Sequence, residues 1–258
     1  MELKFHLTIL ATVALLTPIF LVTAVNAEIK ILSPELIAQN IKFRTPDIKE
    51  KGDTRNTIIF RNRRKCEDGP IALIPETNIG LTLAEYPKFF VYFPASEVLK
   101  DKCNYDVYRV EFGLLDKAGN ILYFTKLKLP DTSSIIKINL PDDGSIPPLA
   151  IGKKYQWYVS ILLDPFDHSD DLFISGWIQR IEATPTLTQE LQITKPNNHP
   201  KVYAEAGIWH ETLDSLAILR QSDPNNSTFL IQWQDILKSV GLEIVADAPL
   251  LGISNNQK

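Results

Sequence analysis

The chain has few of the residues that usually carry redox and metal chemistry. Its 258 residues include only two cysteines, one methionine and four histidines. Cys66 and Cys103 lie far apart in the sequence, so a metal site built on them would need further ligands that no neighbouring motif supplies. In an oxidising compartment the two thiols can instead pair across a long loop, which would stabilise the fold by about 3 to 4 kcal/mol. The sequence leaves open whether Cys66 and Cys103 form this disulfide or remain separate thiols.

An excess of positive charge is also missing. The chain has 27 Lys and Arg residues against 31 Asp and Glu residues, a formal net charge of −4. Proteins that bind nucleic acid or anionic membrane surfaces usually carry a basic patch or a basic overall charge. The composition therefore predicts no nucleic-acid partner.

The common catalytic and nucleotide-binding signatures are absent as well. The chain contains no Gly-x-Ser-x-Gly elbow, no Walker loop and no dinucleotide-binding fingerprint. Catalytic triads assemble in space, so this absence does not exclude an enzyme. It favours a non-enzymatic function.

A long apolar run occurs at the N-terminus. Residues 1–27 combine Lys4, an apolar stretch from Leu7 to Val22 and a small-residue site at 25–27, which is the pattern of a signal peptide cleaved after Ala27. Because the run approaches the roughly 18 residues of a membrane span, an uncleaved N-terminal anchor is the alternative. We expect an exported protein, periplasmic or extracellular, with no transmembrane span after cleavage.

The rest of the chain divides by hydrophobic period. Residues 28–56 are polar and irregular and are expected to form a leader. Residues 57–184 alternate between apolar and polar positions, residues 185–245 show a helical period, and residues 246–258 are expected to form a flexible tail.

The alternating region predicts short antiparallel strands. A hairpin stands out at 105–115 and 120–129, with Gly119 in its turn. Tyr155, Trp157, Val159 and Ile161 fall on one side of another strand and are core candidates. The other expected strands are 71–75, 89–93, 135–140, 155–163 and 172–181. A buried Trp in mid-strand is typical of immunoglobulin-type sandwiches, so the predicted fold class is mainly β: an antiparallel immunoglobulin-like β-sandwich followed by a C-terminal α-helical hairpin.

Two apolar stripes at helical spacing form that hairpin. The first runs from Val202 to Arg220 and the second from Leu230 to Val240, with the cap candidates Asn226 and Ser227 before it. Two short helices cannot bury both stripes against each other. We therefore expect the hairpin to dock on the sheets or on a partner.

Several short motifs occur in a characteristic order along the chain. They are Cys66, I-A-L-I-P at 71–75, G-L-T at 80–82, P-K-F-F-V-Y-F-P at 87–94, K-Y-Q-W at 154–157 and G-W-I-Q-R at 176–180. In this order they resemble the cyanobacterial domain-of-unknown-function family 928. The resemblance implies an exported cyanobacterial protein with no assigned activity.

Two groups of residues are candidate metal ligands. Asp164, Asp167, Asp170 and Asp171 lie on one short loop between expected strands, where carboxylate oxygens can bind Ca²⁺. The usual explanation of such a loop is a solvated acidic turn. His210, Glu211 and Asp214 would share one face of a helix and partly match the His-Glu-x-x-His motif of zinc hydrolases, but the second His is missing.

The aromatic run at 86–93 is a candidate sugar-binding surface. If Phe90 and Tyr92 are exposed on their strand, their rings can stack on a glycan. Strand geometry sends half of the aromatic residues of this run to the opposite face, into the core.

Three functions follow from these features. The leading hypothesis is a non-enzymatic binding or interaction domain of the cell envelope that recognises another envelope protein. The alternatives are a carbohydrate-binding module for cell-wall or exopolysaccharide material, based on Phe90 and Tyr92, and a metal-dependent hydrolase, based on His210, Glu211 and Asp214.

Overall fold

The computed structural model describes residues 40–48, 69–104 and 106–252. The predicted signal peptide and Cys66 lie outside the described residues, and so does the side chain of Cys103. The predicted disulfide therefore stays a prediction. None of the helices formed by the described residues has the length and the hydropathy of a membrane span.

Within the described residues, nine strands form two sheets. Their bounds are β1 (Ile71–Ala72), β2 (Ile79–Thr82), β3 (Lys88–Phe93), β4 (Arg109–Leu115), β5 (Ile121–Leu127), β6 (Ser134–Asn139), β7 (Lys154–Leu162), β8 (Leu172–Arg180) and β9 (Leu250–Gly252). The four-stranded sheet has the order β1-β3-β6-β9, and the five-stranded sheet has the order β2-β8-β7-β4-β5. The expected hairpin is confirmed as β4 and β5, with Gly119 at a φ of 88° in its turn.

The prediction of purely antiparallel sheets is wrong. β2 pairs with β8 in parallel, and β6 pairs with β9 in parallel. Short hairpins force an antiparallel pair, but these strands are joined through long stretches of chain, which allow either direction. The architecture is sandwich-like with mixed sheets, and the immunoglobulin-like connectivity stays a prediction.

Five α-helices accompany the sheets in the described residues. They are α2 (Ser96–Cys103), α3 (Pro185–Ile193), α4 (His199–Glu205), α5 (Trp209–Ser222) and α6 (Ser227–Lys238). Helix α6 begins as predicted, because Asn226 is its N-cap and the Asn226 side chain accepts a hydrogen bond from the backbone N–H of Thr228 at 3.1 Å.

The first expected helical stripe is two helices instead of one. The chain leaves α4 through Gly207, which has a φ of 75° that L side chains rarely adopt. A Cβ at this position would also lie 2.9 Å from the backbone oxygen of Arg44. The hydrophobic pattern alone did not show this break.

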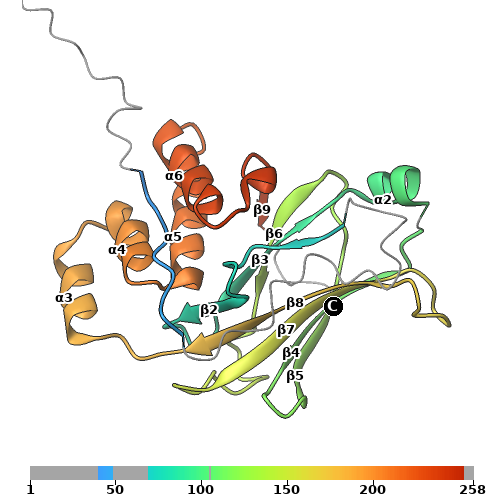
Figure 1. Cartoon of the computed structure of the whole chain (residues 1–258), viewed down its shortest axis with the longest axis horizontal. Coiled ribbons are helices and arrows are strands. Elements are labelled where there is room, and N and C mark those ends of the chain that lie inside the picture. The colour runs from blue at the N-terminus through green and yellow to red at the C-terminus, as the bar shows by residue number, and fades with distance from the viewer. Residues whose placement is uncertain (1–39, 49–68, 105, 253–258) are drawn as a thin grey trace, which may run out of the picture.

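Three layers result, with the four-stranded sheet in the middle (Figure 1). One face of this sheet contributes Phe89, Val91 and Phe93 to the core shared with the five-stranded sheet. As predicted, Tyr155, Trp157, Val159 and Ile161 of β7 lie in this same core.

The opposite face of the four-stranded sheet packs on the helices. Phe90 and Ile135 contact a second buried cluster that contains Trp209 of α5 and Trp233 of α6. Most of the two apolar helical stripes is therefore buried within the chain, although Leu230 at the start of the second stripe is 39% exposed.

The two ends of the described chain belong to this helical layer. Ile41 and Phe43, from the expected leader, are buried in its core. Residues 246–252 do not behave as a tail, because Ala246 is buried there and β9 pairs with β6.

Candidate binding face

The outer face of the five-stranded sheet points away from the helices and the core. Since side chains alternate along a strand, the residues between the core positions of β7 and β8 face outward. On β7 these outward residues include Lys154, Gln156, Tyr158 and Ser160. On β8 they are Phe173, Ser175, Trp177 and Gln179. We call this surface the outer face.

Aromatic side chains form a platform in the middle of the outer face. In the register of the sheet, Gly113 of β4 lies opposite Phe124 of β5 on one side and opposite Tyr158 of β7 on the other. The phenol end of Tyr158 covers Gly113, where a Cβ would come within 2.2 Å of the ring. Tyr158 and Phe173 stack with ring centroids 5.5 Å apart and an interplanar angle of 22°. Phe124 is 43% exposed.

Polar groups flank the platform. One cross-strand row further along β4 and β7, Glu111 lies opposite Ser160, and Ser160 lies opposite Phe173. The carboxylate of Glu111 forms an ion pair with Arg109 on the same face. Burial, followed by the charge of Glu111, raises the pKa of Tyr158 above its ordinary value of 10.0, so the phenol stays protonated and can donate a hydrogen bond at neutral pH.

A hollow of about 600 Å³ opens at one end of the same face. It is lined by the β4–β5 turn, the turn before β7, and the outward residue Gln179 of β8. Three of the lining residues are lysines, Lys117, Lys153 and Lys154. The one acidic residue in the lining is Asp116. Its carboxylate accepts hydrogen bonds from Ala118 N, Asn120 N and the Asn120 side-chain amide, all within its own turn. These hydrogen bonds lower the pKa of Asp116 and keep it charged.

The loop that carries Lys153 is held in place from several sides. The backbone N–H of Ala150 donates to the Tyr155 hydroxyl at 2.9 Å, and Nη1 of Arg180 donates to the Leu149 carbonyl at 2.7 Å. The backbone N–H of Gly152 donates to the Arg180 carbonyl at 2.7 Å. These hydrogen bonds fix the position of the loop that lines the hollow.

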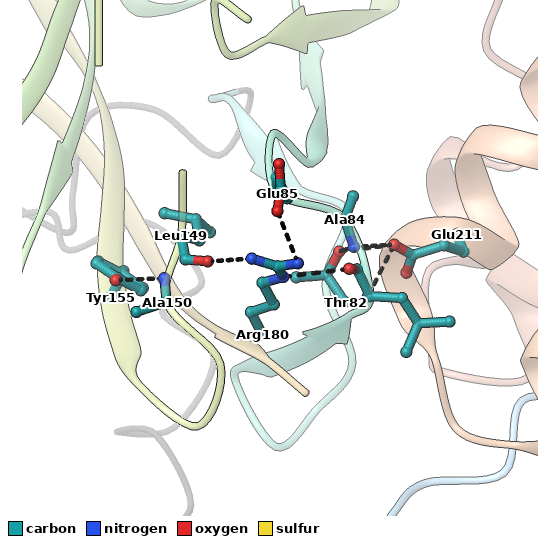
Figure 2. Close-up of polar contacts among 9 residues, drawn as sticks. Thr82, Ala84, Glu85, Leu149, Ala150, Tyr155, Arg180 and Glu211 are labelled. Carbon is teal, nitrogen blue, oxygen red and sulfur yellow. Dashed lines mark hydrogen bonds and ion pairs between the residues drawn. The ribbon is translucent and has the colours of Figure 1, made fainter. Parts of the chain in front are cut away.

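Further polar contacts connect Arg180 to the helical layer (Figure 2). Arg180 also contacts Glu85, with 3.1 Å between Nη2 and Oε1. On the far side of this segment, Oε1 of Glu211 accepts hydrogen bonds from the Thr82 hydroxyl at 2.7 Å and from the backbone N–H groups of Leu83 and Ala84, each at 2.9 Å. We call this set of contacts, from Tyr155 to Glu211, the polar seam.

His210, Glu211 and Asp214 do not meet at a shared point. Nδ1 of His210 lies 2.8 Å from the Lys88 carbonyl on β3, Glu211 binds the segment after β2, and Asp214 pairs with Lys137 on β6. His210 is 5% exposed, and its burial lowers its pKa to about 4. Each of the three side chains fastens α5 to a different part of the sheets. The hydrolase hypothesis required these three side chains to converge on one metal ion, and their contacts direct them to three different parts of the sheets.

The acidic loop between β7 and β8 uses its carboxylates locally. Asp164 accepts hydrogen bonds from Phe166 N and Asp167 N, and Asp167 accepts one from Ser169 N. Asp171 accepts one from Leu163 N and contacts the His168 ring. Asp170 takes no part in these hydrogen bonds, and among the described residues no three His, Cys, Asp or Glu side chains are placed to hold a metal ion. Calcium binding by Asp164, Asp167, Asp170 and Asp171 stays a prediction.

The predicted sugar-binding aromatics lie in the wrong place for that role. Phe90 is 2% exposed and packs edge-on against Trp233, with 5.8 Å between ring centroids. Tyr92 is only partly exposed and packs against the same cluster. Both face the helical layer, because β3 lies in the middle sheet and is covered on both sides.

Sequence reasoning missed the platform on the outer face. The alternation that identified Tyr155, Trp157, Val159 and Ile161 as core also assigns Tyr158 to the opposite face. The alternation along β7 therefore contained this information, but the sugar-binding prediction was based on the denser aromatic run at 86–93, which forms β3. The hollow could not be predicted, because its lysines come from two turns that only the folded sheet brings together.

Comparison with known proteins identifies the family. No curated protein matches the chain. A family model described as Domain of Unknown Function (DUF928) matches residues 50–250, which include most of both sheets and all five helices described above. The resemblance drawn from the motifs is thereby confirmed for the family, while the cyanobacterial source and the export that it implied stay predictions. The chain belongs to the DUF928 family.

Proposed function

We propose that this protein is a non-enzymatic binding domain of the cell envelope and that it binds a glycan on the outer face of its five-stranded sheet. The observation that carries the proposal is the stacked pair Tyr158 and Phe173 beside the exposed ring of Phe124, with the Tyr158 ring lying over Gly113. The cleaved signal peptide predicted at residues 1–27 would deliver the domain to the periplasm or the cell exterior, where such ligands occur.

The chemistry of the face fits a sugar. The C–H faces of a pyranose ring are apolar and pack on aromatic rings, while its hydroxyl groups need hydrogen-bond partners at the rim. Tyr158, Phe173 and Phe124 provide the rings. Glu111, Ser160 and the Tyr158 hydroxyl provide donors and acceptors on the same face.

The structure favours a glycan over the protein partner of the leading hypothesis. That hypothesis relied on helical stripes in need of a docking surface, and most residues of these stripes are buried against the sheets of the same chain. Large apolar side chains that remain exposed on the outer face include Phe124 and Ile121. An exposed aromatic surface beside polar groups marks a binding site.

Affinity electrophoresis of the purified protein through gels that contain cell-wall glycans or exopolysaccharides tests the proposal. We expect retardation by at least one glycan. Tyr158→Ala or Phe173→Ala should weaken binding about tenfold, which corresponds to roughly 1.4 kcal/mol.

Phe166→Ala is the matched control, because Phe166 is 94% exposed in the β7–β8 loop and lies off the platform. It should bind like the unmodified protein. Equal retardation of all three variants and the unmodified protein, or no retardation by any glycan, would remove the proposal.

A further inference from the structure

We propose that the hollow beside the platform takes the anionic group of an acidic glycan, so that the preferred ligand carries carboxylate or sulfate. This inference rests on the proposed function and adds the class of ligand. It concerns the hollow formed by Asp116–Ala118, Gly152–Tyr155 and Gln179.

The charges in the hollow are the first argument. Lys117 and Lys153 are exposed, and neither forms an ion pair within the described part of the chain. Lys154 also lines the hollow, but the charge argument rests on Lys117 and Lys153. The carboxylate of Asp116 is occupied by its own turn through three hydrogen bonds. A local excess of positive charge thus stands on a protein whose net charge is −4, and such a concentration in a concave surface attracts an anion.

The position of the hollow is the second argument. Lys154 and Gln179 are a cross-strand pair on the outer face, and Gln156 with Trp177 forms the row between this pair and Tyr158. Four residues of strand separate Tyr158 from Lys154, which is about 13 Å at 3.3 Å per residue. A single sugar cannot span this distance. The ligand must be an oligomer that stacks on the platform and places its charged group in the hollow.

The rigidity of the hollow is the third argument. Tyr155, Arg180 and Gln179 fix the loop before β7 through the contacts Ala150 N to Tyr155 Oη, Arg180 Nη1 to Leu149 O, and Gln179 Nε2 to Gly152 O at 3.2 Å. A preformed site does not spend binding free energy on ordering its loop. Lys153 therefore lies on a loop that these hydrogen bonds hold in one position.

Calorimetric titrations with matched neutral and acidic ligands test the inference. The probes are cello-oligosaccharides against oligogalacturonates for the carboxylate, and dextran against dextran sulfate for the sulfate. The acidic member of at least one pair should bind about tenfold more tightly at low salt, and the preference should shrink as added salt screens the charges. The pair that shows the preference identifies the anionic group.

Variants locate the effect. Lys117→Gln combined with Lys153→Gln should abolish the preference for the acidic ligand and leave the affinity for the neutral ligand unchanged. The matched control is Lys42→Gln combined with Lys238→Gln, which removes two exposed lysines of the helical layer and should retain the preference.

The outcomes separate the two proposals. Equal affinity for neutral and acidic ligands, abolished by Tyr158→Ala, overturns the inference and leaves the proposed function standing. A preference for acidic ligand that survives the loss of Lys117 and Lys153 also overturns the inference. Binding of neither class contradicts both proposals.

Discussion

Single residues decide how the helical layer sits on the sheets. Gly80 of β2 lies directly under α5, where a Cβ would come within 2.5 Å of His210 Nε2 and within 3.2 Å of the Trp209 ring. Nearby, the indole N–H of Trp209 donates a hydrogen bond to the Leu73 carbonyl at 2.8 Å. Close approach of helix and strand at this point requires glycine.

Gly80→Ala should therefore destabilise the fold. The added methyl group overpacks the contact with His210, which typically costs about 1 to 3 kcal/mol. Urea denaturation measures the change in the free energy of unfolding. The double variant Gly80→Ala with His210→Ala should cost less than the sum of the two single variants, because it removes the clashing ring. Strict additivity would show that the close contact is absent.

The buried His210 should make stability depend on pH. Its pKa is lowered from 6.5 to about 4, chiefly by burial, whereas the Lys88 hydrogen bond and the charge of Asp214 act in the opposite direction. The unfolded chain therefore binds the proton at a higher pH than the folded one does. As the pH falls from about 6.5 towards 4, the free energy of unfolding falls, by about 2 kcal/mol between pH 7 and 4.5.

The His210→Asn variant isolates this effect. The Asn amide can still donate to the Lys88 carbonyl, but it does not titrate. Burial also raises the pKa of Glu211, which stabilises the folded state in acid, and this opposite contribution is common to both proteins. Denaturation at pH 7 and 4.5 should show the larger loss in the unmodified protein. The same loss in both proteins would contradict the assignment.

At the scale of elements, the polar seam joins the end of β2 to α5 on one side and to β8 on the other (Figure 2). Glu211 accepts all three of its hydrogen bonds from this segment at one oxygen, while Oε2 is buried without a hydrogen-bond partner. Oε1 of Glu211 therefore makes all of these contacts, and the second oxygen of the carboxylate adds no hydrogen bond to the seam.

Two substitutions of Glu211 should separate the acceptor from the charge. Glu211→Leu leaves the N–H of Leu83 and the hydroxyl of Thr82 without this acceptor, while the N–H of Ala84 keeps the Thr82 hydroxyl oxygen at 3.1 Å, and should cost about 3 kcal/mol. Glu211→Gln keeps one carbonyl oxygen in place and should cost less than about 1 kcal/mol. Thermal and urea denaturation measure both. Equal losses would show that the hydrogen bonds of the seam do not stabilise the fold.

The same seam should influence ligand preference. Tyr155→Phe removes the acceptor for Ala150 N and loosens the loop that carries Lys153. We expect about threefold weaker binding of the acidic ligand, roughly 0.7 kcal/mol, with neutral ligand unaffected. Tyr108→Phe, at an exposed residue outside the hollow, is the control for titration calorimetry. An unchanged preference in Tyr155→Phe would show that the frame of the hollow does not depend on this hydrogen bond.

The elements also show how far the sequence predicts this fold. Alternation located β3 to β8 within a few residues, and the cap at Asn226 located the start of α6. A period of two separates the faces of a strand but does not show which face a further layer covers, so Phe90 was expected on a surface and lies in the interior. The parallel pairs β2 with β8 and β9 with β6 depend on contacts between distant parts of the chain, which local patterns do not encode.

At the scale of the whole molecule, helices α4, α5 and α6 lie on one side of the sandwich and leave the outer face on the other (Figure 1). We propose that the uncovered outer face is the side that binds ligand. The predicted export belongs to the same account, since an envelope glycan is met only outside the cytoplasm. Fractionation of producing cells should find the processed chain in the periplasm or the medium. An intact precursor in the cytosol would contradict this expectation.

The tryptophans provide the most direct test of glycan binding on the outer face. Of the four tryptophans, Trp157, Trp209 and Trp233 are at most 1% exposed, whereas Trp177 is partly exposed on the outer face, one row from Tyr158. Acrylamide should therefore quench mainly the fluorescence of Trp177. A saturating glycan is predicted to protect it, and the protection should vanish in Trp177→Phe. A glycan that binds with full affinity and leaves the quenching of Trp177 unchanged would contradict the account.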